Sequence, residues 1–118
     1  ITRENENHGI LEKFETLLNT YFSSEKPTSI GFPSVAYCAD KLHLSANYFG
    51  DLIKKETGKS AQEYIQNKII TLAKNKILED HLSVNEIAYE LGFKYPQHFS
   101  RFFKQHVGAT PNEYRNSN

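Results

Sequence analysis

Residues 83–115 read SVNEIAYELGFKYPQHFSRFFKQHVGATPNEYR, and this stretch decides the fold. It opens with a capping-box pattern, Ser83 with Glu86, in which a hydroxyl accepts from the third residue's N–H and the glutamate reaches back. Thr110 and Glu113 repeat that pattern near its end. Gly108 stands where the helix before it should stop, because glycine adopts the left-handed conformation of a helix C-terminal cap. Gly92 occupies a tight turn for the same conformational reason. The stretch therefore predicts a short helix, a tight turn, a longer helix and a last short helix.

The same layout occurs a second time, in residues 39–65, which read ADKLHLSANYFGDLIKKETGKSAQEYI. Ala39 and Leu42 match Ala88 and Leu91 at an offset of 49 residues. At an offset of 50 residues, matches are found for Phe49, Lys54, Gly58, Glu63 and Tyr64. A short helix with a small residue, a tight turn and a longer helix is the layout of a helix-turn-helix. The chain is thus predicted to contain a duplicated helix-turn-helix, with His43 at positive φ where the second copy has Gly92.

Helical periodicity extends over most of the remaining chain. Residues 9–22 form an amphipathic pattern, whereas residues 23–34 hold two prolines and a glycine and are expected to be a linker or ordered loop. A helix over 61–78 would span roughly 27 Å at about 1.5 Å per residue. This length would suit a strut between two recognition helices, which must lie about 34 Å apart to enter successive major grooves of DNA. The alternative is a core helix that joins two bundles. We expect an all-α fold of about seven helices: 9–22, 35–42, 46–57, 61–78, 84–91, 95–107 and 111–116.

The composition is that of an ordinary soluble domain. The 118 residues include 14 basic and 14 acidic side chains, one cysteine and no methionine. No apolar run approaches the roughly 18 residues of a membrane helix, so no membrane partner is expected. The single Cys38 excludes an intramolecular disulfide and a cysteine-based metal site, and fits a reducing cytoplasm. Because the chain starts at Ile1 and lacks methionine, we expect it to be a fragment of a longer protein.

Both quoted stretches resemble the DNA-binding domain of AraC-type (AraC/XylS) transcription regulators. The second is the more specific, because the family's signature spacing is met by Ile87-Ala88, Gly92-Phe93, Phe99-Ser100-Arg101, Phe103-Lys104, Gly108 and Thr110-Pro111 to Tyr114-Arg115. The resemblance covers residues 34–115. It implies two helix-turn-helix units joined by a long linker helix, and sequence-specific binding to double-stranded promoter DNA, usually for activation. It also implies an upstream sensor or oligomerisation domain and RNA polymerase as a partner.

The resemblance further implies a division of the chain and a set of residues that read bases. Residues 1–33 would be a lead-in helix and linker loop, and residues 34–118 the DNA-binding domain, with units at 34–60 and 83–116. The base-reading positions correspond to Ala46, Asn47, Gly50 and Asp51 in the first unit and Tyr95, Pro96, Gln97, Ser100 and Arg101 in the second. Arg101 can fork onto guanine, and Gln97 or Asn47 can pair with adenine. An ordinary solvated helix face, or a surface ion pair for Arg101, is the alternative explanation.

The first unit departs from the family pattern at two positions. Asp51 stands where relatives often carry a basic or amide side chain; it can accept from cytosine, or pair with Lys54 or Lys55 on its own helix. Gly50 contributes no contact to a base. We therefore expect the first unit to read DNA less directly.

Charge is unevenly distributed along the chain. Residues 1–33 sum to −2 and residues 34–118 to +2. Residues 45–57 are neutral, whereas residues 94–106 carry two lysines, one arginine and no acid. The second unit is therefore expected to supply more of the attraction to phosphate, and the expected phosphate contacts, which hold register without reading sequence, are Ser45, Lys54, Lys55, Lys94 and Lys104.

The other conspicuous residues have structural explanations. The two small cores are expected to contain Phe49, Leu52, Ile53, Phe93, Phe99, Phe102 and Phe103, although a stacking platform for single strands is an alternative. Tyr64 and Tyr114 are expected to support these cores, each with its hydroxyl on a backbone group. We expect no cofactor, no metal and no enzymatic activity, because the chain shows no nucleophile–base pair, phosphate loop or metal motif. A helical protein-interaction module without DNA affinity is the competing function.

Overall fold

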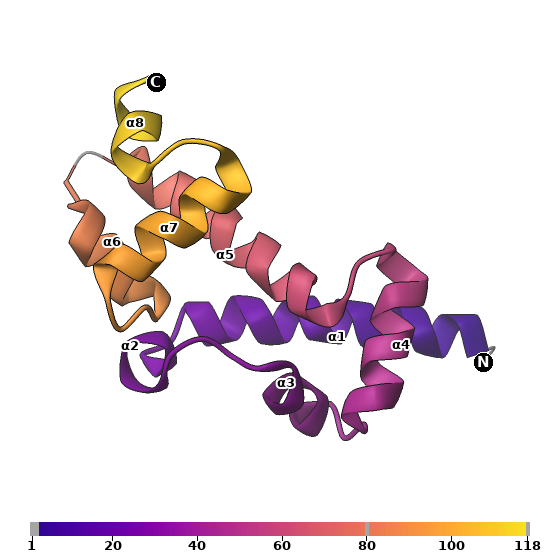
Figure 1. The fold of residues 1–118 in the computed structure, drawn as a ribbon. Coiled ribbons are helices and arrows are strands. Elements are labelled where there is room, and N and C mark those ends of the chain that lie inside the picture. Colours follow the sequence, from indigo (N-terminus) through magenta and orange to yellow (C-terminus); the bar gives the residue numbers. More distant parts are fainter. Residues whose placement is uncertain (1–2, 80, 118) are drawn as a thin grey trace. The chain divides into compact units, whose positions relative to one another are not determined.

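The computed structural model describes residues 3–79 and 81–117, with side chains described from residue 9 onward. Within these ranges the backbone forms eight helices and no strand (Figure 1), so the expected all-α class is confirmed. The helices are α1 (Arg3–Phe22), α2 (Lys26–Ile30), α3 (Val35–Lys41), α4 (Ala46–Thr57), α5 (Ala61–Ile77), α6 (Val84–Leu91), α7 (Pro96–Val107) and α8 (Pro111–Asn116).

The chain divides into two compact units, which we describe separately. The first comprises the chain up to Ser23 together with Pro33–Asn67, and the second comprises Ser24–Phe32 and the chain from Lys68 onward. The first unit therefore holds α1, α3, α4 and the beginning of α5. The second holds α2, the remainder of α5, and α6 to α8. The chain crosses from one unit to the other three times: before α2, after α2, and within α5.

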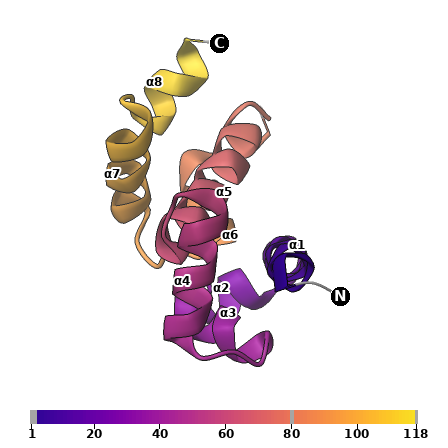
Figure 2. The same cartoon turned by 90° about the vertical axis from the view of Figure 1, so that its right-hand side faces the viewer.

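The core of the first unit forms where α1 packs against α4. Phe14 is fully buried, and its ring meets the Phe49 ring edge-on with centroids 4.9 Å apart. Burying a side chain of this size contributes roughly 1.5–3 kcal/mol, so α1 is a structural part of this unit. α3 and α4 lie next to each other in both views (Figures 1 and 2), and Cys38 of α3 is fully buried.

The core of the second unit forms around the packing of α6 on α7. Its fully buried side chains include Ile77, Ile87, Leu91, Phe99 and Phe103. α8 packs against α7, where the rings of Phe103 and Tyr114 are in edge-on contact with centroids 5.5 Å apart. Arg115 fastens α8 to the end of α5, because its Nε donates to the carbonyl of Ile77 at 2.8 Å.

Side chains cap the starts of several helices, and those of Ser83 and Thr110 were expected from the sequence. Ser83 and Thr110 begin helices with complete capping boxes, and Ser60 exchanges the same pair of hydrogen bonds with Glu63. Ser34 and Ser45 accept from the backbone N–H three residues later. Each cap satisfies N–H groups that the first turn of a helix leaves without partners, so these local patterns fix where five of the helices, α3, α4, α5, α6 and α8, begin.

The two tight turns share a backbone hydrogen bond and a residue at positive φ, as the sequence repeat predicts. The N–H of Leu44 donates to the carbonyl of Ala39, and the N–H of Phe93 donates to Ala88, both at 2.9 Å. His43 takes a φ of 60° and Gly92 a φ of 103°, as expected. Because Leu44 matches Phe93 whereas the N-cap Ser45 matches the N-cap Tyr95, the additional residue of the second turn is Lys94.

Several expectations need correction. The segment 23–34 is not only a loop, because it contains α2, and α1 begins at Arg3, six residues earlier than expected. α1 contributes Phe14 to the core of the first unit, and Ser24–Phe32 belongs to the second unit. Phe102 is half-buried instead of buried. The hydroxyl of Tyr64 donates to the Glu15 carboxylate and not to a backbone group.

Candidate nucleic-acid interface

In the first unit, α4 has one buried face and one exposed face. Phe49, Leu52 and Ile53 are buried, and Ala46, Asn47, Asp51, Lys54 and Lys55 are exposed, with Gly50 half-buried. At about 3.6 residues per turn, Asn47, Asp51 and Lys54 share one face. The hydroxyl of Ser45 accepts from the N–H of Tyr48 at 3.1 Å, which leaves its O–H free to donate to another group.

In the second unit, α7 has the same arrangement. It begins at Pro96, where the missing N–H of proline costs nothing because a first-turn N–H has no helical partner. Phe99 and Phe103 are fully buried. Tyr95, Gln97 and Arg101 are exposed, while Pro96 and Ser100 are half-buried. Gln97, Arg101 and Lys104 follow one another at intervals of four and three residues, so one exposed face carries an amide, a guanidinium and an ammonium group.

Asp51 on α4 and Arg101 on α7 form no ion pair with another residue that the structure describes. Among the residues that the structure describes, neither Asp51 nor Arg101 takes part in a salt bridge, whereas Lys76 pairs with Glu90 and His81 lies near Glu79. Within the described part of the chain, Arg101 therefore has no surface ion pair, and Asp51 does not pair with Lys54 or Lys55. The carboxylate of Asp51 and the guanidinium of Arg101 are available to a partner.

The four expected phosphate-binding lysines, Lys54, Lys55, Lys94 and Lys104, are all exposed. Lys94 lies over the ring of Tyr95, with Nζ 5.6 Å from the ring centroid, which places its charge at the start of α7. Lys54 and Lys104 lie near the capping glutamates of the following helices. The capping hydrogen bonds lower the pKa of Glu63 and Glu113, and the nearby lysine charges lower the pKa of each further. Both carboxylates thus stay ionised at neutral pH.

Two exposed aromatic side chains at these helix starts were not among the expected site residues. Tyr48 lies on the first turn of α4 and is 42% exposed. His98 lies against the ring of Tyr95 with centroids 5.2 Å apart. Their position on the exposed stripe of each helix is the signal by which the sequence could have indicated them.

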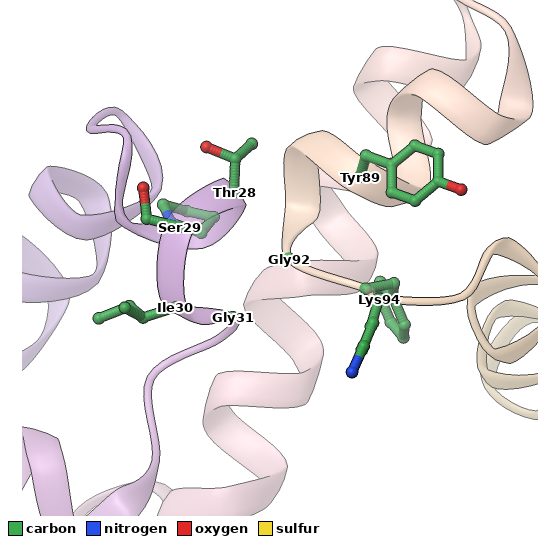
Figure 3. Close-up of a pocket in the computed structure, with 9 residues that line it drawn as sticks. Thr28, Ser29, Ile30, Gly31, Tyr89, Gly92 and Lys94 are labelled. Carbon is green, nitrogen blue, oxygen red and sulfur yellow. The ribbon is translucent and has the colours of Figure 1, made fainter.

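Other kinds of site are not found in the part of the chain that the structure describes. No group of three or more His, Cys, Asp or Glu side chains there is placed to hold a metal ion. No helix among the described residues is long and apolar enough to cross a bilayer. A pocket of about 550 Å³ lies in the second unit between α2 and the turn before α7, and Thr28, Tyr89 and Lys94 are among the residues that line it (Figure 3).

Comparison with known proteins places this arrangement in a family. A family described as "Helix-turn-helix domain" matches residues 38–117, which include both turns and both exposed helix faces. The chain belongs to the AraC-type helix-turn-helix family. It is thus a helix-turn-helix DNA-binding domain of the kind found in bacterial transcription regulators.

Individual members of the AraC-type family show the extent of the likeness. The HTH-type transcriptional regulator YtdP of Bacillus subtilis is 39% identical over 77 residues, which cover 65% of this chain and 10% of YtdP. The transcriptional activator RhaS of Escherichia coli is 30% identical over 77 residues, covering 65% of this chain and 28% of RhaS. The solved C-terminal domain of AraT, a response regulator from Geobacillus stearothermophilus, has a TM-score of 0.80 at 26% identity, covering 92% of this chain and 85% of that domain. The chain spans between 10% and 45% of the length of the four curated relatives YtdP, YesN, YobQ and YfiF.

Proposed function

We propose that the chain binds double-stranded promoter DNA in a sequence-specific manner, with α4 and α7 as recognition helices in successive major grooves. The observation that carries this proposal is the exposed face of α7, where Gln97, Arg101 and Lys104 lie in a row and Arg101 has no ion-pair partner among the described residues. Residues 34–118 would form the reading domain, with units at 34–60 and 83–116, and α5 would be the strut between them.

In the second unit, each side chain of the α7 face suits a contact with DNA. Arg101 would donate two hydrogen bonds to guanine O6 and N7, and Gln97 would pair with adenine N6 and N7. Tyr95, Pro96 and Ser100 would contact base edges or thymine methyl groups beside them. Lys94 and Lys104 would bind phosphates at either end of the helix and so fix its register.

In the first unit, fewer groups can read sequence. Asn47 is the counterpart of Gln97 and would pair with adenine, while Ala46 and Gly50 present little more than backbone and a methyl group. Asp51 would either accept from cytosine N4 or repel phosphate. Ser45, Lys54 and Lys55 would bind phosphates. The larger share of the attraction is therefore assigned to the second unit.

The role of the whole protein is inferred from the proteins that this chain resembles. RhaS is described as a transcriptional activator and the AraT domain as the C-terminal domain of a response regulator. By extension, this chain would be the output domain of a larger cytoplasmic regulator that activates transcription through RNA polymerase, with an upstream sensor or oligomerisation domain.

A duplex-selection experiment tests the proposal against a protein-interaction module. The chain is used to select duplexes from a random pool at low salt, and the affinity for the selected duplex is then compared with that for a scrambled duplex by fluorescence anisotropy. Specific binding proteins prefer their sites by about a thousandfold or more. Enrichment of a defined sequence with clear preference over the scrambled duplex supports the proposal. Absence of any enriched sequence at low salt would favour the protein-interaction module.

A further inference from the structure

The segment Ser24–Phe32, which we call the strap, lies outside the matched helix-turn-helix region yet packs within the second unit. α2 lies against α6, and Pro27 is fully buried. Figure 3 shows Gly31, at the end of α2, facing Gly92 in the turn that leads to α7. The strap therefore reaches the turn on which the direction of α7 depends.

The contact between the strap and this turn is made by backbone on both sides. A Cβ atom on Gly92 would lie 3.0 Å from the carbonyl carbon of Gly31, 3.1 Å from the nitrogen of Phe32 and 3.2 Å from the oxygen of Pro27. These distances are shorter than van der Waals contact, and all three atoms belong to the main chain. Gly92 is thus needed for the approach of the strap as well as for its φ of 103°.

Beyond this contact, aromatic rings connect the strap to α7. The ring of Phe32 meets that of Phe93 edge-on at 4.8 Å. The Phe93 ring lies 5.3 Å from Phe99 and 5.5 Å from Phe102, both on α7. Phe99 and Phe102 flank Ser100 and Arg101 in the sequence. A displacement of Phe32 would thus be transmitted through one buried ring to the residues that present Arg101.

We propose that the strap positions α7, the recognition helix of the second unit. Phe32 acts through Phe93 to hold α7 at the angle that DNA reading requires. This inference rests on the proposed function. It assigns a role to residues that the family match leaves out, and it makes Phe32 a positioning residue that need not touch DNA itself. Sites whose supporting residues are loose lose affinity even when the contacting groups are intact.

The test compares Phe32→Ala with Phe32→Tyr and Ile30→Ala. Tyrosine keeps the ring, and Phe32 is 42% exposed, which leaves room for the hydroxyl. Ile30 is the matched control, because it lies on the same strap, is 67% exposed and points away from Gly92 (Figure 3). Affinities are measured for the selected duplex and for duplexes in which one half-site is scrambled. The half-site that α7 contacts is identified with the variant Arg101→Ala. Scrambling that half-site abolishes the loss of affinity that this substitution causes on the intact duplex.

The positioning role predicts that Phe32→Ala lowers the affinity for the intact duplex by about fivefold, the size of effect that one aromatic contact supplies. It also predicts no loss on the duplex whose α7 half-site is scrambled, and wild-type affinity for Phe32→Tyr and Ile30→Ala. Unchanged affinity of Phe32→Ala, or an equal loss on both duplexes, would overturn the proposal. If Phe32→Ala fails to fold by circular dichroism, Phe32→Leu takes its place, because leucine fills volume without the edge-on ring contact.

A spectroscopic measurement separates failure of this inference from failure of the proposed function. Backbone amide shifts of α7 and α4 are compared between wild type and variants without DNA. Shifts in α7 with α4 unchanged, seen for Phe32→Ala but not for Ile30→Ala, support the positioning contact even if no duplex is bound. Unchanged α7 shifts would contradict it even if the wild type binds DNA tightly.

Discussion

Asp51 and Arg101 occupy the same place in the two repeats: each is the sixth residue of its helix, and each is exposed. Their neighbours on the exposed faces also correspond, Asn47 with Gln97 and Lys54 with Lys104. The faces thus differ at this place by two units of charge. This single difference accounts for most of the expected inequality between the two units in attracting DNA.

Asp51→Asn should strengthen DNA binding if the carboxylate only repels phosphate. Removal of one exposed like charge changes the interaction by up to about 1 kcal/mol, so we expect about a two- to fivefold higher affinity at low salt. The measurement is fluorescence anisotropy with the selected duplex. Glu56→Gln is the matched control, since it removes a charge from a different face of α4. A loss of affinity confined to one base pair would instead show that Asp51 reads a cytosine.

Arg101→Ala and Lys104→Ala should weaken binding in different ways. Loss of a bidentate contact to guanine costs about 1–3 kcal/mol and relaxes the preference at one base pair. Loss of a phosphate contact weakens binding to all sequences and reduces the slope of log affinity against log salt by about one. Titrations at several salt concentrations, with matched and mismatched duplexes, separate the two.

Lys74→Ala serves as the control for both variants, because it removes the same charge from α5. An unchanged salt slope for Lys104→Ala would withdraw its assignment to phosphate. Equal weakening on matched and mismatched duplexes would withdraw the assignment of Arg101 to a base.

Much of the architecture could be predicted because its causes are local. Ser83 with Glu86 and Thr110 with Glu113 fix helix starts through hydrogen bonds three residues apart. The exposed face of α7 follows from the intervals between Phe99, Phe103 and the polar residues between them. The same local patterns occur twice in the chain, which makes the duplicated unit recognisable in the amino-acid sequence.

The features that were not foreseen depend on residues far apart in the chain. α2 begins at Lys26 without a side-chain cap, and the burial of Pro27 against the second unit holds it in place. Tyr64 donates to a carboxylate 49 residues away. At the candidate site, the composition of α4 did not reveal whether Asp51 pairs with Lys54, because helical spacing allows that pair without requiring it.

Gly92→Ala should destabilise the second unit more than Gly108→Ala. Both glycines adopt positive φ, which costs alanine about 1–2 kcal/mol. A Cβ on Gly108 meets nothing within 4 Å, whereas one on Gly92 meets three backbone atoms of the strap. Overpacking of this kind adds about 1–3 kcal/mol. Urea unfolding followed by circular dichroism gives both values, and equal losses would show that the strap does not constrain the turn.

Cys38 should resist alkylation in the folded protein. Its side chain is fully buried, and burial raises the pKa of the thiol to about 11. Because the thiolate is the reactive form, almost none is present at neutral pH, and reaction should increase only as pH rises toward 11 or the chain opens. Iodoacetamide labelling at pH 7.5, followed by mass spectrometry, should be slow in buffer and complete in urea. Equal rates in both would mean that α3 opens readily.

Hydroxyl-radical footprinting of the selected duplex tests the central claim most directly. Two recognition helices in successive major grooves should protect two segments whose centres lie one helical turn, about 10–10.5 base pairs, apart on one face of the DNA. Arg101→Ala should weaken protection of one segment more than the other. No protection at low salt, or a single protected segment unaffected by Arg101→Ala, would contradict the account.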